Sequence, residues 1–384
     1  MNLIYLKSKI LVAFFTNFNR KTRCSKMLKV LSPDGTIIDS NSEPKLSNEN
    51  LLKMYETMVI VRLMDTKGLR LQRQGRIGFH IPTTGQEATQ VAVVAALDEK
   101  DWLFPAYREP GMAIYRGLPL KEIIDHWFGN KFDPQKGRRI PGLFGEKEKT
   151  KFVNASAPIG TQIIQAAGAA YAAKYLNDGT CNVVFFGDGA TSSNDFHSGM
   201  NFAGVTKAPT IFFCQNNQWA ISVPLSKQTA SESIAAKAQA YGMPGIQVDG
   251  NDILAVYAVM TDAIKHARNG NGPTMIEALT YRMGPHTSSD DPSRYRSKEE
   301  VEEQAKRDPI QRFENYLLRK NILTQEKIET IRKTRDEELN RLIKEAEEAA
   351  PPELVDLFTD VYTEMPRHLR EQYEDLQRIK REYE

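Results

Sequence analysis

The chain has 384 residues, of which 41% are hydrophobic and 26% are charged, and its formal net charge is +2. This composition is typical of a globular protein with a packed core and excludes global disorder. The nearly balanced charge also gives no basis for predicting nucleic-acid binding, so we expect none.

The first 26 residues are basic and contain no acidic side chain. Their apolar run at 10–15 is too short to span a bilayer, so we predict no membrane association. We favour an extension upstream of a start at Met27, with a cytoplasmic protein. A transit peptide, which would place the protein in the mitochondrial matrix, and a secretory signal without a clear cleavage site are the alternatives.

Apolar spacing predicts three helices in the first half of the chain, at 48–75, 86–97 and 161–175. The third is rich in alanine and lacks internal proline. Cys181 and Cys214 lie in or beside the apolar runs that follow. Together with Cys24 they form no CxxC pair, so we expect buried thiols in a reduced protein rather than disulfides or a zinc site.

The middle of the chain alternates short apolar runs with a helical segment. The runs at 182–186 and 210–214 are typical of strands buried on both faces of a parallel sheet, and a helix at 195–205 connects them. A further strand is predicted at 273–279. This order indicates an α/β fold with a mainly parallel central sheet.

From residue 298 the sequence predicts long, charged helices that carry one apolar stripe. The stripe consists of Ile328, Ile331, Leu339, Leu342 and Ile343. We therefore divide the chain into a basic extension at 1–26, an α/β domain at 27–297 and a C-terminal helical, subunit-contact region at 298–384.

Two polar groups follow the two central predicted strands. Gly187, Asp188 and Gly189 end the first, and Asn217 comes just after the second. Carboxyl ends of parallel strands meet at one edge of a sheet, where ligands bind. A carboxylate and an amide oxygen suit Mg²⁺, which also takes phosphate oxygens.

This GDG triplet with an NN pair further along resembles the thiamine-diphosphate motif. The resemblance implies that Asp188, Asn217 and the backbone carbonyl of Trp219 hold Mg²⁺ on the diphosphate of the cofactor. No GxGxxG or GxxxxGK[ST] pattern is present, which argues against a nicotinamide-dependent oxidoreductase.

Residues 45–375 resemble the alpha subunit of the decarboxylating component of 2-oxo acid dehydrogenase complexes, and so imply a three-layer α/β/α thiamine-diphosphate fold. Tyr107 and Arg108 are similar to a diphosphate clamp, and Arg282 to a second one. His286 would be catalytic, since histidine exchanges protons near neutral pH. The predicted cofactor-binding residues are Tyr107, Arg108, Ile159, Gly187, Asp188, Gly189, Ala190, Asn217, Trp219, Arg282 and His286. His80, with Phe79, is a weaker candidate for the substrate pocket.

A segment that runs into the start of the third predicted helix is similar to one that binds K⁺ in some relatives. Its candidate ligands are Ser156, Pro158, Thr161 and Gln162. The sequence departs from branched-chain relatives at Ala157, where a serine reaches the diphosphate, and at Gln215, where an arginine does. These two departures affect the expected diphosphate contacts and leave the predicted Mg²⁺ ligands unchanged.

Thiamine enzymes of this kind need a second α/β domain and a glutamate for the aminopyrimidine, and no second series of strands follows here. The resemblance therefore implies a beta subunit in a heterotetramer of two alpha and two beta chains. It also implies acyl transfer to the lipoyl groups of an acyltransferase component after decarboxylation of a 2-oxo acid.

Two segments, 286–292 and 360–366, resemble enzymes for the branched-chain substrate 3-methyl-2-oxobutanoate, and this is the substrate we favour. Residues 78–79 and 82–87 look more like pyruvate enzymes, and acetoin dehydrogenase is a third alternative. A non-catalytic structural subunit would leave Asp188, Asn217, Arg108 and Arg282 unexplained. Phosphorylation of Ser288, Ser289 or Ser297 would add negative charge beside the diphosphate site.

Overall fold

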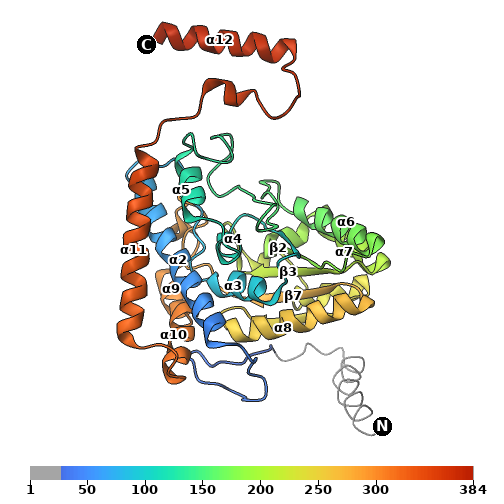
Figure 1. The fold of residues 1–384 in the computed structure, drawn as a ribbon. Helices are drawn as coiled ribbons and strands as arrows, with labels where there is room; N and C mark the ends of the chain where they lie inside the picture. Colours follow the sequence, from blue (N-terminus) through green and yellow to red (C-terminus); the bar gives the residue numbers. More distant parts are fainter. Residues whose placement is uncertain (1–26, 384) are drawn as a thin grey trace.

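A computed structural model describes residues 27–383, so our interpretations of the 1–26 segment lie outside the described residues. Its main sheet is parallel throughout, with strand order β1-β2-β3-β7-β6. The strands are β1 (Trp102–Phe104), β2 (Asn182–Gly187), β3 (Thr210–Asn216), β7 (Thr274–Leu279) and β6 (Gly245–Asp249). Helices cover both faces of this sheet, so the predicted three-layer α/β/α fold is confirmed (Figure 1).

The central strands are apolar on both faces because each face carries a helical layer. Alternate residues of β2 point in opposite directions. Val183 and Phe185 belong to one buried cluster, whereas Val184 and Phe186 belong to the other. The continuous apolar run that predicted this strand therefore reflects two cores on either side of one sheet.

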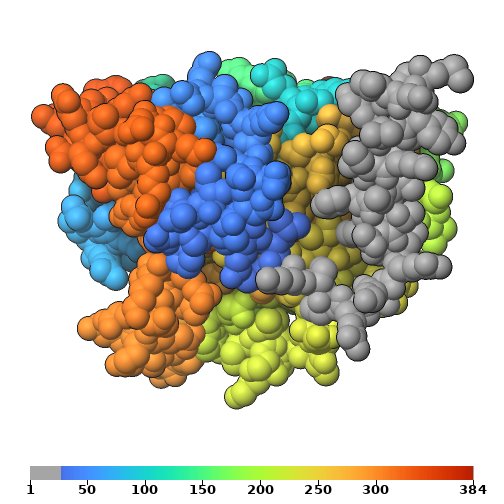
Figure 2. All heavy atoms as spheres, turned by 90° about the horizontal axis from the view of Figure 1, so that it is seen from below, coloured from blue at the N-terminus to red at the C-terminus, as the bar shows by residue number. Residues whose placement is uncertain are grey.

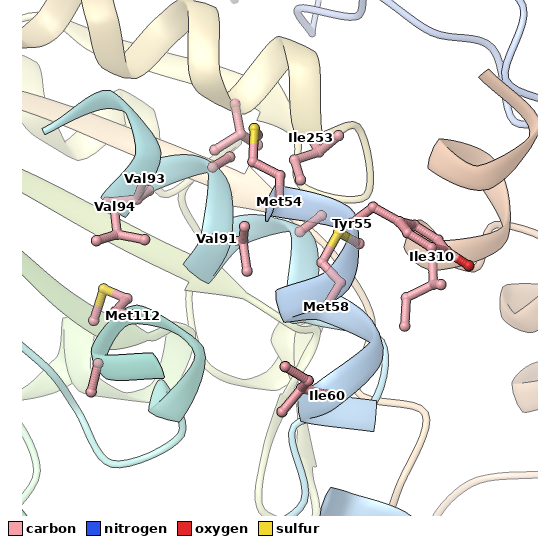
Figure 3. Packing of buried hydrophobic residues seen from close by; sticks show 14 of the residues in the cluster. Met54, Tyr55, Met58, Ile60, Val91, Val93, Val94, Met112, Ile253 and Ile310 are labelled. Atoms are coloured by element: carbon pink, nitrogen blue, oxygen red, sulfur yellow. The ribbon is translucent and has the colours of Figure 1, made fainter. Parts of the chain in front are cut away.

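The first face is covered by α2 (Asn48–Arg73), α3 (Glu87–Ala96), α4 (Pro110–Tyr115) and α8 (Ile253–His266). Met54 and Met58 of α2 pack beside Val91 of α3 in this core (Figure 3). Ser47 caps α2 by accepting a hydrogen bond from the backbone of Asn50 at 3.2 Å. The helices predicted at 48–75 and 86–97 are thus confirmed.

The second face is covered by α6 (Thr161–Leu176) and α7 (Asn194–Thr206), and by a short 3₁₀ helix, Ala235–Tyr241. Small side chains such as Ala166 and Ala170 let α6 lie close to the sheet, and both are fully buried. Ser193 caps α7 by accepting from the backbone of Phe196 at 3.2 Å. Both helices match the predicted ones.

The C-terminal helices are α9 (Lys298–Ala305), α10 (Pro309–Arg319), α11 (Gln325–Glu347) and α12 (Arg367–Tyr383). Phe313 of α10 and Leu339 of α11 enter the same buried cluster as α2 and α5 (Leu120–Phe128). In contrast, α12 has no buried residue and extends away from the body (Figure 1). The predicted boundary at 298 and the subunit-contact role of this region stay predictions.

The first described residues are tied to the end of the sheet and to α10. Asp252, just before α8, accepts hydrogen bonds from the backbone of Val30 at 2.7 Å and of Leu31 at 2.6 Å. Arg312 of α10 donates to the carbonyl of Leu31. Figure 2 shows this blue segment between α8 and the orange C-terminal helices.

Cys181 and Cys214 are both fully buried free thiols, as predicted. Within residues 27–383, no helix is long and apolar enough to cross a membrane. The sequence analysis did not predict β1, β6, α4, α5 or α8. The two strands are only three and five residues long, too short for a clear alternating pattern.

Candidate functional site

A pocket of about 460 Å³ opens at the carboxyl ends of the central strands. Its walls come from segments far apart in the sequence, because parallel strands deliver their following loops to one edge. All residues predicted to contact a cofactor line it: Tyr107, Arg108, Ile159, Gly187, Asp188, Gly189, Ala190, Asn217, Trp219, Arg282 and His286. Their roles toward a cofactor stay predictions.

Asp188 and Asn217 meet because β2 and β3 are paired in register, with Gly187 opposite Gln215. The Asp188 side chain is 1% exposed, and its Oδ2 accepts from Nε2 of Gln228 at 2.5 Å. Burial raises the pKa of this carboxyl group, and the Gln228 hydrogen bond partly opposes that shift. A carboxylate held there would gain from a bound cation.

The candidate metal ligands present only oxygen atoms: the Asp188 carboxylate, the Asn217 amide and the Trp219 carbonyl. In the described part of the chain, no group of three or more His, Cys, Asp or Glu side chains could hold a metal. A cation held by one carboxylate would need further oxygens from its ligand, and this suits Mg²⁺ on a diphosphate. Gly189 lets the backbone approach closely, because an added Cβ would lie 2.8 Å from that of Ala220.

Opposite the carboxylate lie two buried guanidinium groups. Arg108 is 4% exposed and Arg282 is 1% exposed. Arg108 donates to the carbonyls of Pro82 and His286. Arg282 donates to the carbonyls of Trp219 and Ile221, at 3.2 and 2.6 Å.

Neither guanidinium group forms a salt bridge with a carboxylate within residues 27–383. Arg282 also donates to the Tyr295 hydroxyl at 2.9 Å, and both arginines face Nδ1 of His286. All of these acceptors are neutral, and Nε of Arg282 is buried without a hydrogen-bond partner. Burial and the Arg108 charge lower the pKa of Arg282. Buried charges without counterions are unfavourable, so the site is suited to an anion.

His286 lies between the two arginines and is itself neutral. Its Nδ1 is 3.1 Å from Nη2 of Arg108 and 3.3 Å from Nη1 of Arg282. Burial, followed by the charges of these arginines, lowers the pKa of His286 to about 3. Asp290 anchors the loop by accepting from the backbone of His286 at 2.7 Å.

The turn that presents Tyr107 and Arg108 is organised by Glu109. One oxygen of this buried carboxyl group accepts from the backbone N–H groups of Ala106, Tyr107 and Arg108, at 2.9 to 3.1 Å. Burial raises the pKa of Glu109 to about 7. Gln215 donates to Glu109 at 3.3 Å and is not among the residues that line the pocket. At the position where branched-chain relatives have an arginine, Gln215 therefore contacts the carboxyl group that organises this turn.

The remaining predicted residues do not all line this pocket. Ser156 and Gln162 line the pocket, whereas Pro158 and Thr161 are not among its lining residues. His80 lies instead in a separate, mostly apolar pocket of about 30 Å³. Tyr107 lines both pockets, and Phe79 lines neither.

Three residues that the sequence analysis did not single out hold the site together. They are Gln86, Gln228 and Tyr295, which contact Asn217, Asp188 and Arg282 respectively. Each is a single polar side chain in an unremarkable stretch of sequence. Gln86 did open the helix predicted at 86–97 and belonged to the segment 82–87, which was noted for its resemblance, but no chemical role was assigned to it.

Comparison with known proteins gives one family and a consistent set of relatives. The family model described as dehydrogenase E1 component matches residues 55–355. The chain is 46% identical to the 3-methyl-2-oxobutanoate dehydrogenase subunit alpha of Mycobacterium tuberculosis, over 91% of this chain and 93% of that one. It is 44% identical to the pyruvate dehydrogenase E1 component subunit alpha of Acholeplasma laidlawii, covering 89% and 97%. It is 43% identical to the human mitochondrial 2-oxoisovalerate dehydrogenase subunit alpha, covering 91% and 79%.

Proposed function

The chain belongs to the dehydrogenase E1 component family, and we propose that it is the alpha subunit of a branched-chain 2-oxo acid dehydrogenase. Membership of this family implies thiamine diphosphate as the cofactor and a beta subunit as a partner. The proposed reaction is oxidative decarboxylation of 3-methyl-2-oxobutanoate, with transfer of the acyl group to a lipoyl group of an acyltransferase component.

The observation that carries this proposal is the pair of buried guanidinium groups that form no salt bridge among the described residues. Arg108 and Arg282 are held by neutral acceptors, so a diphosphate would supply the missing negative charge. The planar donor fork of arginine matches phosphate oxygens. The Tyr107 hydroxyl is a further donor on the same wall. A purely structural subunit would have no reason to bury two cations beside an open pocket.

The cation would sit on the other side of the diphosphate. Asp188 and Asn217, with the Trp219 carbonyl, are the proposed Mg²⁺ ligands, since all three line the pocket and present oxygen. The Trp219 carbonyl already accepts from Arg282 and has a second lone pair. For K⁺ we retain the candidate set from the sequence: Ser156, Pro158, Thr161 and Gln162.

His286 is the proposed catalytic residue. When bound, the cofactor supplies the electron sink for decarboxylation. The imidazole keeps its proton on Nε2, because Nδ1 faces two donors. A diphosphate would offset the two arginine charges that suppress protonation, so His286 could then hold and pass a proton during acyl transfer.

A beta subunit would complete the site. Asp188 is the sole carboxylate among the described residues that line the pocket, so the glutamate needed for the aminopyrimidine must come from elsewhere. Ile159 and Ile221 line the pocket and remain 53% and 55% exposed. These features support a site shared between subunits, and we propose the two-alpha, two-beta heterotetramer.

An exposed apolar surface on α6 and α7 also supports assembly with another subunit. We call it the α6–α7 patch; it consists of Ile164, Tyr171, Tyr175, Leu176, Phe202 and Val205. Tyr171 and Phe202 are in edge contact across the two helices, with ring centroids 5.5 Å apart, so the patch is continuous there. Such clustering of exposed aromatic and aliphatic groups indicates a protein interface.

Pyruvate is the second candidate substrate, because a pyruvate dehydrogenase alpha subunit is nearly as similar as the branched-chain relatives. The test is the decarboxylation rate of the chain assembled with its beta partner, Mg²⁺ and thiamine diphosphate, using an artificial electron acceptor. We expect 3-methyl-2-oxobutanoate to be preferred over pyruvate. Preference for pyruvate would correct the substrate, and turnover of neither acid would contradict the proposed function.

A further inference from the structure

An amide side chain can bind a cation only through its oxygen, because its NH₂ group carries positive partial charge. Both ends of the Asn217 amide have partners in this structure. Nδ2 donates to Oε1 of Gln86 at 2.9 Å, and Oδ1 accepts from the backbone N–H of Trp219 at 3.2 Å. With its NH₂ directed to Gln86, the Asn217 side chain presents its oxygen to the turn that carries Trp219.

Gln86 is well placed to impose this orientation. Its side chain is fully buried, and its backbone is fixed where α3 begins. The Gln86 N–H donates to the carbonyl of Thr83 at 2.9 Å, and its carbonyl accepts from Oγ1 of Thr89 at 2.7 Å. The acceptor that faces Asn217 therefore belongs to a rigid part of the fold.

The two amides are coupled. Nε2 of Gln86 is buried and has no hydrogen-bond partner among the described residues, which is unfavourable. Reversing Gln86 alone would set its NH₂ against that of Asn217. Reversing both amides would set the NH₂ of Asn217 against the N–H of Trp219. The observed orientation is the one in which Asn217 meets neither conflict.

We propose that Gln86 is a positioning residue for the Mg²⁺ site, acting as the acceptor that keeps the oxygen of Asn217 toward the cation. This inference rests on the proposed function, since it takes Asn217 as a ligand. It predicts that the acceptor oxygen matters and the packing volume does not. Supporting residues of this kind typically change metal affinity by about 10–100-fold when they are lost.

The test is a calorimetric titration of Mg²⁺ into the full chain assembled with its beta partner, at saturating thiamine diphosphate. Gln86→Met removes the acceptor at nearly constant length and should weaken Mg²⁺ binding by about 10–100-fold. Gln86→Glu keeps an acceptor oxygen and should restore the affinity. Melting temperatures without Mg²⁺ show whether the fold is intact, and Gln86→Asn, one methylene shorter, replaces the Met variant if that variant does not assemble.

A double-mutant cycle separates positioning from packing. Asn217→Asp has no NH₂ group to orient, so adding Gln86→Met to it should cause no further loss of Mg²⁺ affinity. An equal loss in both backgrounds, or unchanged affinity in Gln86→Met alone, would overturn this inference while leaving the proposed function intact. If the wild-type assembly shows no Mg²⁺-dependent binding of thiamine diphosphate, the proposed function fails and this inference fails with it.

Discussion

The ring nitrogen Nδ1 of His286 lies 3.1 Å from Nη2 of Arg108. A guanidinium can only donate, so this contact requires a histidine that is neutral at Nδ1. Nη1 of Arg282 lies 3.3 Å from the same nitrogen and imposes the same requirement. The residue proposed to handle protons is therefore held unprotonated by the two groups proposed to bind the diphosphate.

Without ligand, His286 should not titrate near the ordinary histidine pKa of 6.5, because burial and the two arginines lower its pKa to about 3. Between those values the unfolded chain takes up the proton first. The contribution of His286 to the free energy of unfolding therefore decreases as the pH falls below 6.5. An NMR titration of the histidine ring signals checks this. Titration of His286 near 6.5 in the unliganded chain would contradict the prediction.

Thiamine diphosphate binding should raise the pKa of His286, since the diphosphate offsets the Arg108 and Arg282 charges. Binding at mildly acidic pH would then take up a proton. Calorimetric titrations in two buffers of different ionisation enthalpy measure this uptake directly, and the His286→Asn variant, which cannot take up this proton, is the control. Equal proton uptake by wild type and variant would exclude His286 as the site.

His286→Asn should separate binding from catalysis. The asparagine oxygen can replace Nδ1 as an acceptor for the arginines, so the affinity for thiamine diphosphate should change little. Transfer of the acyl group to lipoate should fall by about 100-fold or more, because the variant cannot exchange a proton. Both quantities are measured on the alpha–beta assembly, and unchanged lipoate acylation would remove His286 from the mechanism.

Asp188→Asn should strongly weaken Mg²⁺-dependent cofactor binding without destabilising the fold. Burial raises the pKa of Asp188, so its charge is unfavourable in the empty site. The neutral variant should melt at the same or a higher temperature without ligand, and should bind thiamine diphosphate about 100-fold more weakly. Gln228 can contact asparagine as well as aspartate, which makes this a matched substitution. Tight Mg²⁺-dependent binding by the variant would show that the cation lies elsewhere.

The sequence was sufficient to predict Asp188 and Asn217 as neighbours, because each follows an apolar strand and parallel strands end at one edge. It could not predict Gln86, which lies 131 residues from Asn217, or Gln228, which lies 40 residues from Asp188. Such contacts depend on how helices and loops pack over the sheet. A single glutamine forms no periodic sequence pattern from which such a contact could be predicted.

The same limit explains why α8 was not predicted. The first eight residues of α8, at 253–260, are all apolar, and such a run cannot be told from a buried strand by its periodicity. His80, with Phe79, was a weaker candidate for the substrate pocket, and this role stays a prediction. Its ring lies in the smaller pocket, where its centroid is 5.0 Å from that of the Trp127 ring.

The α6–α7 patch should be required for assembly with the beta subunit. Val205 is 78% exposed, so Val205→Glu should leave the melting temperature of the isolated chain nearly unchanged. Burying that charge in an apolar interface without a partner is costly, so co-expressed beta subunit should no longer co-elute in size-exclusion chromatography. Ile38→Glu, at a 56% exposed site outside the patch, is the matched control and should assemble normally. Normal assembly of Val205→Glu would mean that the beta subunit docks on another face and that the exposed α6 and α7 side chains serve a different contact.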